Sequence, residues 1–479
     1  MRFLNWNSVF LMGVISFILY SAYFYHGGTY FRMVPVHHDD YSNLSSFIND
    51  FFNKGVYVRP VSTMIIAFLS MLGELEYLIF QFLFLSTYVF LVIIFLSRIF
   101  NVRVTWYSVA CSAVFISTLP NVVEYHFYTG LMTNLSSAVF GMLALVLFQR
   151  FNGEKYLKFV ILFLILSAFS KEDYILPFIV FTSIFCVYDR FLVQNNDRLV
   201  RYLKLLFISL LILVSSLIFN KSSGSAFVSS DTSYYLISFD FFDILNVYNF
   251  YLFRNIHFVV LVFISILFSL IHITSSFNKK EAFLNILIIY AIVLSLIAPY
   301  SLLKNHLAPY YSFMWFVWIS VLSCVIIQSL CAKIKISYIS AFLYSFSVLF
   351  VAFYFSFHFK PERESVIRWY ENQQNITLRI FNALDQLLLT KSNLDKIYVI
   401  NPPGLSPWSH SSGQYLERKK HINSQWVVLV KETDNFYTVG EHVGKVSVLK
   451  LNDINKMELG HPSIEFTNEN IIIDTGAKL

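Results

Sequence analysis

Apolar runs of about 20 residues, the length that crosses a bilayer as a helix, recur between residues 8 and 358 of this 479-residue chain. These runs are mostly free of Asp, Glu, Lys and Arg. The composition agrees, because 57% of the residues are hydrophobic and only 13% are charged, whereas a soluble domain carries about 25% charged residues. The sequence therefore predicts a mainly α-helical protein that crosses a membrane many times.

The positions of the runs predict about eleven transmembrane helices. The first run lacks a small-residue cleavage site, so we expect it to stay as a helix rather than to be removed as a signal peptide. The run at 61–72 is too short to span and is predicted to be an interfacial or buried helix. The predicted spans are 8–25, 77–97, 105–119, 131–149, 157–171, 174–188, 205–220, 256–275, 282–302, 310–331 and 337–358.

The distribution of Lys and Arg over the connecting segments predicts an orientation. Cytoplasmic loops carry an excess of Lys and Arg, so the richer of the two alternating sets of segments is predicted to be cytoplasmic and the poorer set to face outward. The richer set holds Arg2, Arg98, Arg103, Arg150, Lys155, Lys158, Arg190, Arg198, Arg201, Lys204, Lys279, Lys280, Lys333 and Lys335. The poorer set, up to residue 360, holds Arg32, Lys54, Arg59, Lys171, Lys221, Arg254 and Lys304, with Lys360 at its edge.

Acidic residues are sorted the other way and gather on the predicted outer side. Asp and Glu have little influence on topology, so insertion does not require this excess, and a functional acidic cluster is one reason for it. The net charge of +6 is spread over loops and gives no indication of a nucleic-acid partner. The outer acidic residues are Asp39, Asp40, Asp50, Glu74, Glu76, Glu124, Glu172, Asp173, Asp231, Asp240 and Asp243.

The character of the chain changes after Lys360. Residues 361–479 are polar, with one stretch of helical periodicity and four short strand-like runs separated by turn residues. We predict a transmembrane domain at 1–360, with a long first outer loop at 26–76, and a small α/β domain at 361–479. An odd number of spans precedes this second domain, which places it outside the cytoplasm.

The first outer loop contains four consecutive titratable residues in "VPVHHDDYSNL", namely His37, His38, Asp39 and Asp40. A carboxylate that is partly desolvated at a membrane surface has a raised pKa and can act as a general base. His and Asp also ligate divalent cations, although four consecutive residues cannot all converge on one ion. A general base, a metal site and an ordinary solvated loop all fit this stretch.

Further candidates lie on the same predicted side. Lys171, Glu172 and Asp173 stand between two apolar runs, where Lys171 could bind a phosphate and the acids could orient a hydroxyl, or where the three could form a self-satisfied polar turn. Arg59 precedes Pro60, a residue that favours the first turn of a helix, and a guanidinium there could bind a phosphate or carboxylate. The remaining candidates are Glu124 with His126, and Lys304 with His306.

The acidic pair after the first span, the Arg59-Pro60 pair in the same loop and the stretch "SKEDYILPF" together resemble the C-type (GT-C) glycosyltransferase superfamily. The motif of that superfamily is DD, DE or ED in the first outer loop, and Asp39-Asp40 matches it. The likeness covers residues 1 to 220, and the size, span count and polar C-terminal domain look most like the glucosyltransferases that modify bacterial O-antigen.

This resemblance implies an inverting hexosyltransferase of the bacterial inner membrane. It would move a sugar such as glucose from an undecaprenyl-phosphate carrier to a glycan acceptor on the periplasmic side. Asp39 or Asp40 would be the base, while Arg59, Lys171, Lys304 and His306 would hold the donor phosphate. His38, Glu124, Glu172 and Asp173 would orient the substrates. We expect no cofactor and no essential metal, with a divalent cation at His37, His38, Asp39 and Asp40 as the alternative.

Two other functions fit a chain of this kind. A flippase or transporter for a lipid-linked saccharide would carry its charges in the middle of broken spans, whereas the apolar runs here are mostly uncharged. An O-antigen polymerase would be expected to present clusters of Arg on the outer side, where this sequence has few.

Overall fold

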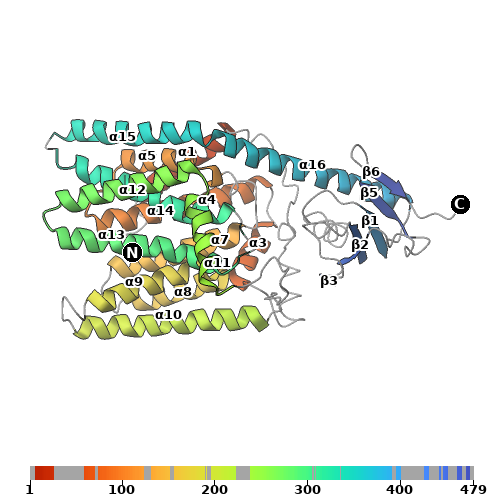
Figure 1. The fold of residues 1–479 in the computed structure, drawn as a ribbon, viewed down its shortest axis with the longest axis horizontal. Helices are drawn as coiled ribbons and strands as arrows, with labels where there is room; N and C mark the ends of the chain where they lie inside the picture. The colour runs from red at the N-terminus through yellow and green to blue at the C-terminus, as the bar shows by residue number, and fades with distance from the viewer. Residues whose placement is uncertain are drawn as a thin grey trace.

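The structure is a computed structural model whose described residues form a helical bundle, a long connecting helix and a small sheet (Figure 1). The structure describes the following residues and no others. They are 6–25, 59–70, 74–122, 131–150, 156–188, 190, 196–222, 238–304, 307, 309–334, 336–390, 395–400, 425–430, 442–443, 446–450, 461–466 and 471–474.

Every apolar run that was predicted to span coincides with a helix. Seven of the described helices are long and apolar enough to cross a membrane, and shorter apolar helices pack beside them. The helices are α1 (Trp6–Tyr25), α4 (Glu74–Ile99), α5 (Trp106–Ser117), α7 (Met132–Arg150), α8 (Leu157–Ser170), α9 (Ile175–Tyr188), α10 (Asn196–Ser222), α12 (Ile256–Ser275), α13 (Lys279–Ser301), α14 (Phe313–Cys331) and α15 (Ser337–His358).

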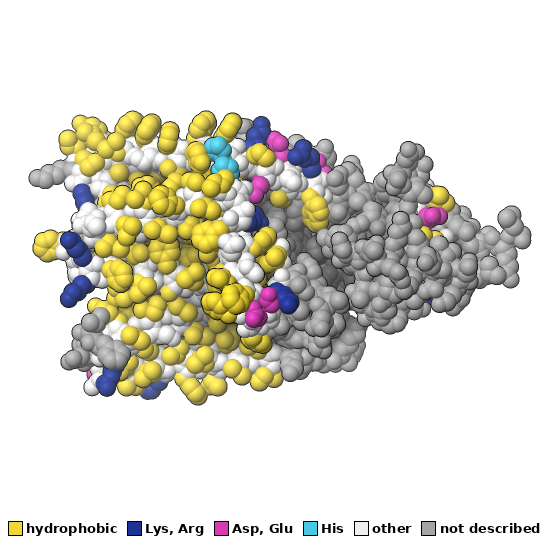
Figure 2. All heavy atoms as spheres, viewed as in Figure 1, with side chains coloured by type: hydrophobic (Ala, Val, Ile, Leu, Met, Phe, Trp, Pro, Cys, Tyr) yellow, Lys and Arg dark blue, Asp and Glu magenta, His cyan; other side chains and the backbone are white. Residues whose placement is uncertain are grey.

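The bundle is built around α14, and its outer helices are covered by apolar side chains. Most of α14 is buried, including Trp315 and Trp318, whereas large parts of α10 and α15 are exposed. On α15, Phe342, Phe346 and Phe350 are exposed and stack one turn apart. Figure 2 shows hydrophobic side chains over the whole flank between the two ends of the bundle. Such a surface fits contact with lipid tails rather than with water.

Two short helices lie at the end of the bundle that faces the sheet (Figure 1). Helix α3 (Pro60–Ser70) is the predicted short helix, and it packs against α7 and α8. Helix α11 (Phe241–Phe253) begins at Asp240, whose carboxylate accepts hydrogen bonds from the N–H groups of Phe242 and Asp243. Its Tyr251 is buried, while Phe241 and Phe242 are exposed, so α11 has one face on the bundle and one face outside it.

The C-terminal part is a long helix followed by a mostly parallel sheet. Helix α16 (Lys360–Thr390) continues from the end of α15, and the strands are β1 (Lys396–Ile400), β2 (Gln425–Val430), β3 (His442–Val443), β4 (Val446–Lys450), β5 (Ser463–Phe466) and β6 (Ile471–Asp474). Their order is β3-β4-β2-β1-β5-β6, with antiparallel pairing only at the two edges. The four predicted strands are β1, β2, β4 and β6, whereas β3 and β5 were not predicted. The division of the chain at residue 360 stays a prediction.

The two ends of the bundle differ in charge. The turns between α12 and α13 and between α14 and α15 lie at the end away from the sheet (Figure 1), and Lys and Arg dominate the charged atoms visible there in Figure 2. Acidic and basic side chains occur together at the opposite end. The described turns at 276–278 and 332–334 therefore lie at the end of the bundle opposite to the Lys171–Asp173 connection.

Candidate functional site

The connection between α8 and α9 forms a tight polar corner. Helix α8 ends at Ser170, Lys171 has an extended backbone, and Glu172–Tyr174 form one turn of 3₁₀-helix before α9 begins. The carbonyl of Lys171 accepts a hydrogen bond from Ser137 Oγ of α7 at 2.5 Å. Helix α7 approaches the corner closely at Gly141, where an added Cβ would lie 2.4 Å from Tyr174 Cβ. Small side chains on α7 therefore fix the position of this corner.

The start of α3 brings Arg59 beside the same corner. Pro60 is the first residue of α3, as the sequence predicts, and the Arg59 carbonyl accepts from Thr63 N–H and Ser62 Oγ. Ser62 Oγ also contacts the Ser170 carbonyl at 2.9 Å, which ties α3 to the end of α8. Arg59 itself has a φ of 57°, a left-handed conformation that is rare for a residue with a side chain. Strain of this kind persists only where the surroundings enforce it and is frequent at functional sites.

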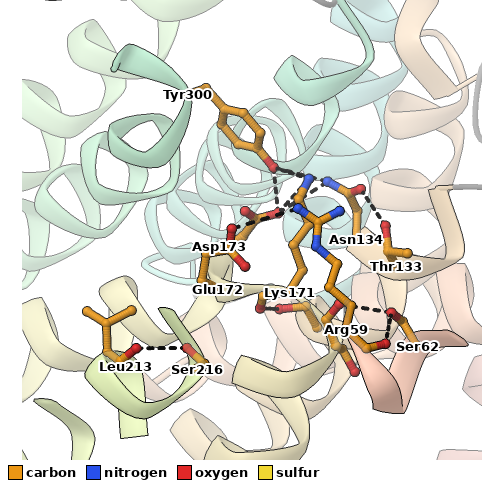
Figure 3. A network of polar contacts seen from close by, with 12 residues as sticks. Arg59, Ser62, Thr133, Asn134, Lys171, Glu172, Asp173, Leu213, Ser216 and Tyr300 are labelled. Carbon is orange, nitrogen blue, oxygen red and sulfur yellow. Dashed lines mark hydrogen bonds and ion pairs between the residues drawn. The ribbon is translucent and has the colours of Figure 1, made fainter. Parts of the chain in front are cut away.

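Lys171 lies inside a buried hydrogen-bonded network. Its Nζ is 3.3 Å from Asp173 Oδ2 and donates to Tyr300 Oη at 2.9 Å. Tyr300 Oη donates to the same carboxylate oxygen at 2.5 Å. Asn134 Nδ2 lies 3.2 Å from Asp173 Oδ2 and 3.1 Å from Tyr300 Oη. Figure 3 shows how α7, the α8–α9 corner and α13 bring these four side chains to one point.

Aromatic rings enclose the ammonium group of Lys171. Nζ lies 4.9 Å from the centre of the Tyr300 ring and 4.4 Å from that of Tyr311. The two rings stack on each other with their centres 3.9 Å apart. A cation that has lost water gains from the negative faces of such rings. Lys171 is only 4% exposed and Asp173 only 3%, so the pair is sealed from solvent.

Burial shifts the proton affinity of both charged groups. It lowers the pKa of Lys171 to about 8, although the nearby Asp173 carboxylate acts in the opposite direction. It also raises the pKa of Asp173, against the effect of the Lys171 ammonium. Both shifts have the same cause, because a low-dielectric environment disfavours the charged form of either group. The two groups therefore depend on each other for their charges.

A second ion pair lies next to the buried one and is more open. Arg59 Nη2 is 3.8 Å from Glu172 Oε1, too long for a hydrogen bond. The side chains of Arg59 and Glu172 are 33% and 24% exposed. Arg59 Nε, Glu172 Oε2 and Asp173 Oδ1 are each inaccessible and have no hydrogen-bond partner in the part of the chain that the structure describes. The corner thus combines a sealed pair with a looser pair that has spare donor and acceptor atoms.

The structure describes only some of the predicted site residues. It brings Arg59, Lys171, Glu172 and Asp173 together. Lys304 lies elsewhere, 3.3 Å from Asp243 of α11, whose pKa is lowered by a hydrogen bond from Ser238 Oγ and by Lys304. The other candidates lie outside the described residues, and their roles stay predictions: His37, His38, Asp39, Asp40, Glu124, His126 and His306.

Sequence reasoning did not select three residues of this network. Asn134, Tyr300 and Tyr311 complete the surroundings of Lys171 and Asp173. Asn134 gave a usable signal, because a polar side chain within an apolar run is costly unless it has a partner. Tyr300 and Tyr311 gave none, because tyrosines at the ends of spans are ordinary interfacial residues.

Within the described ranges, no three His, Cys, Asp or Glu side chains are arranged to hold a metal ion. The Arg59 guanidinium of the corner is suited instead to an anionic group.

Comparisons with known proteins add a limited result. No protein-family model matches the sequence, and no curated protein matches it. One solved structure similar to this chain is that of ArnT from Cupriavidus metallidurans in the apo state. It is 12% identical over 90% of this chain and 87% of that chain, with a TM-score of 0.46. At that level the similarity assigns neither a substrate nor a residue role here.

Proposed function

We propose that this protein is an integral-membrane glycosyltransferase that moves a sugar from a polyprenyl-phosphate carrier to a glycan acceptor outside the cytoplasm. In more detail, we propose that the protein spans a bacterial inner membrane eleven times and that its site and its C-terminal domain lie on the periplasmic side. The carrier is undecaprenyl phosphate, the sugar is a hexose such as glucose, and the acceptor is an O-antigen glycan.

The proposal rests on one observation, which is that Arg59 lies beside the corner formed by Lys171, Glu172 and Asp173. These residues come from two segments that the sequence singled out separately as candidates for phosphate binding. Their charged groups lie 3.8 Å and 3.3 Å apart in two ion pairs at one end of an apolar bundle. A partly open site that contains a guanidinium and lies at the end of membrane helices fits a lipid phosphate, because the chain of such a ligand can stay in the bilayer.

The proposed reaction is a single displacement at the anomeric carbon. The acceptor hydroxyl oxygen attacks that carbon, the bond to the phosphate oxygen breaks, and the polyprenyl phosphate leaves with inversion of configuration. Asp39, or Asp40, takes the proton of the acceptor hydroxyl as general base. Arg59 stabilises the negative charge that develops on the leaving phosphate.

The rival functions make different demands on the charged residues. A transporter built on broken helices would place its charges in the middle of spans. Here the buried pair of Lys171 and Asp173 lies in the connection between α8 and α9, at an end of the bundle. An O-antigen polymerase would transfer preassembled repeats rather than single sugars. The three functions therefore differ in what they transfer or transport, namely a single sugar, an intact lipid or a whole repeat.

The test is a transfer assay with the purified protein in nanodiscs. The donor is undecaprenyl-phosphate glucose with a label in the glucose, and the acceptor is lipopolysaccharide. Transfer of single sugars is expected. Arg59→Gln should lower kcat/KM by about ten- to a hundredfold, because a hydrogen bond to a charged group contributes about 1.5–3 kcal/mol.

The matched control for this assay is Arg201→Gln, an exposed arginine on α10 that donates to the Asp197 carbonyl. It should transfer sugar at the wild-type rate. Passage of intact donor lipid between the leaflets of sealed proteoliposomes, without bond cleavage, would establish the transporter instead, and transfer of whole repeats from a lipid-linked repeat donor would establish the polymerase.

The orientation of the bundle gives a separate prediction. The Lys and Arg distribution places Lys360 and the following domain outside the cytoplasm. Alkaline phosphatase fused after residue 360 should therefore be active, and a green fluorescent protein fused at the same position and exported by the general secretory route should stay dark. The reverse result would mean that the number of spans is wrong by one and that the site faces the cytoplasm.

A further inference from the structure

We propose that Glu172 is an internal counter-ion that the anionic group of the donor lipid displaces from Arg59. This inference rests on the proposed function and adds a step to it. In the absence of ligand the Glu172 carboxylate pairs with the Arg59 guanidinium. A bound phosphate takes the place of that carboxylate. Lys171 and Asp173 stay paired throughout and serve to hold the corner in position.

The charge balance of the corner is the first reason. Arg59 pairs with Glu172 and Lys171 pairs with Asp173, so two cations face two carboxylates and leave no net positive charge. A phosphate added to this arrangement would meet as much repulsion as attraction. Binding of an anion therefore requires that one carboxylate give up its cation.

The two pairs differ in how readily they can separate. Lys171 and Asp173 have side chains that are 5% exposed each, and Tyr300 and Asn134 hold the carboxylate from other helices. The Arg59 and Glu172 groups are joined at 3.8 Å by charge alone and are several times more exposed. Glu172 is thus the carboxylate that can move away at least cost.

The spare polar atoms show what the looser pair can accept. Arg59 Nε is inaccessible and has no partner among the described residues, although a guanidinium can donate five hydrogen bonds. Glu172 Oε2 is also inaccessible and has no hydrogen-bond partner among the described residues. The backbone of Arg59 is fixed in its left-handed conformation by Ser62, Thr63 and Pro60. The guanidinium therefore stays in place when Glu172 leaves, and phosphate oxygens fill the vacated position.

The consequence is that the carboxylate competes with the lipid phosphate. The Glu172→Gln variant should bind farnesyl phosphate, a soluble analogue of the carrier, about tenfold more tightly than wild type does, a factor typical of the coupling between two ligands of one protein. Glu172→Asp should bind with an affinity between those of the other two, because its shorter carboxylate still competes from a greater distance.

The test is titration calorimetry of the full chain in detergent with farnesyl phosphate, inorganic phosphate and farnesol. Glu364→Gln is the control, since Glu364 pairs with the exposed Lys360 on α16 and should leave every affinity unchanged. Tighter binding of farnesyl phosphate, but not of farnesol, by Glu172→Gln supports the displacement. Equal or weaker binding by Glu172→Gln and Glu172→Asp would overturn it while leaving the proposed function intact.

The other arms test the proposed function itself. If neither wild type nor Glu172→Gln binds farnesyl phosphate, the polyprenyl-phosphate donor is wrong and the displacement is wrong with it. If inorganic phosphate binds as tightly as farnesyl phosphate and tightens by the same factor in Glu172→Gln, the displacement stands and the lipid carrier does not.

Discussion

Asp39→Asn is expected to lower the rate of sugar transfer by about a hundred- to ten-thousandfold, the usual contribution of a general base. Asparagine keeps the size of the side chain but cannot take the proton of the acceptor hydroxyl. The measurement is kcat with saturating donor and acceptor in nanodiscs. Asp40→Asn should be affected in the same way if the second carboxylate is the base or orients it.

Three further measurements make this result interpretable. Both variants should insert and accumulate as wild type does, and both should still bind farnesyl phosphate, because the phosphate site is built by Arg59 rather than by the acidic pair. Asp50→Asn, in the same predicted outer loop, is the matched control and should keep its activity. Near-normal transfer by both Asp39→Asn and Asp40→Asn would show that the acidic pair is a solvated part of the loop.

Lys171→Met is expected to reduce the free energy of unfolding by about 3–5 kcal/mol, the cost of leaving a buried charge without its partner. Methionine fills a similar space beside the stacked Tyr300 and Tyr311 rings, so the loss reports the missing charge rather than a cavity. Among the described residues, Tyr300 and Asn134 would then be left to hold the buried Asp173 carboxylate by hydrogen bonds. Unfolding by denaturant in detergent, followed by intrinsic fluorescence, measures the change.

The double variant Lys171→Met with Asp173→Asn separates structure from catalysis. With both charges gone, most of the stability should return, because a neutral replacement of a buried ion pair is often tolerated. Recovery of transfer together with stability would show that Lys171 acts only by holding the corner. Recovery of stability without transfer would show that the charge of Lys171 or of Asp173 acts on the substrates, as the sequence resemblance implies. Lys360→Met, which removes an exposed partner of Glu364, should change stability by less than about 0.5 kcal/mol.

A Lys171→Met variant as stable as wild type would contradict the buried pair itself. In that case the network around Tyr300 would not depend on the ammonium group. Arg59 would then be the only described cation of the corner that contributes to the site.

The sequence alone determined where the apolar helices of the bundle lie along the chain. Apolar runs such as 256–275 and 337–358 coincide with α12 and α15. The length and hydropathy of a run can be read from consecutive residues, and a bilayer requires both of a helix that spans it. The start of α3 at Pro60 was predicted for a similar local reason. Of the two strands that escaped prediction, β3 has only two residues, which is too short for a pattern of alternation. Strand β5 has four residues, as the predicted β6 does, but it lacks the run of three isoleucines that marks β6.

Only the tertiary structure decided which charged groups are partners. The sequence allowed Lys171 to face a phosphate or to pair with its neighbours, and the packing of α7, α8 and α13 places it against Asp173 and Tyr300. Arg59 reaches Glu172 because Ser62 binds the end of α8. Apart from the Lys171–Asp173 pair, these contacts join residues that are more than a hundred positions apart in the chain. They depend on how closely helices approach at small residues such as Ser137 and Gly141, which local sequence patterns do not encode.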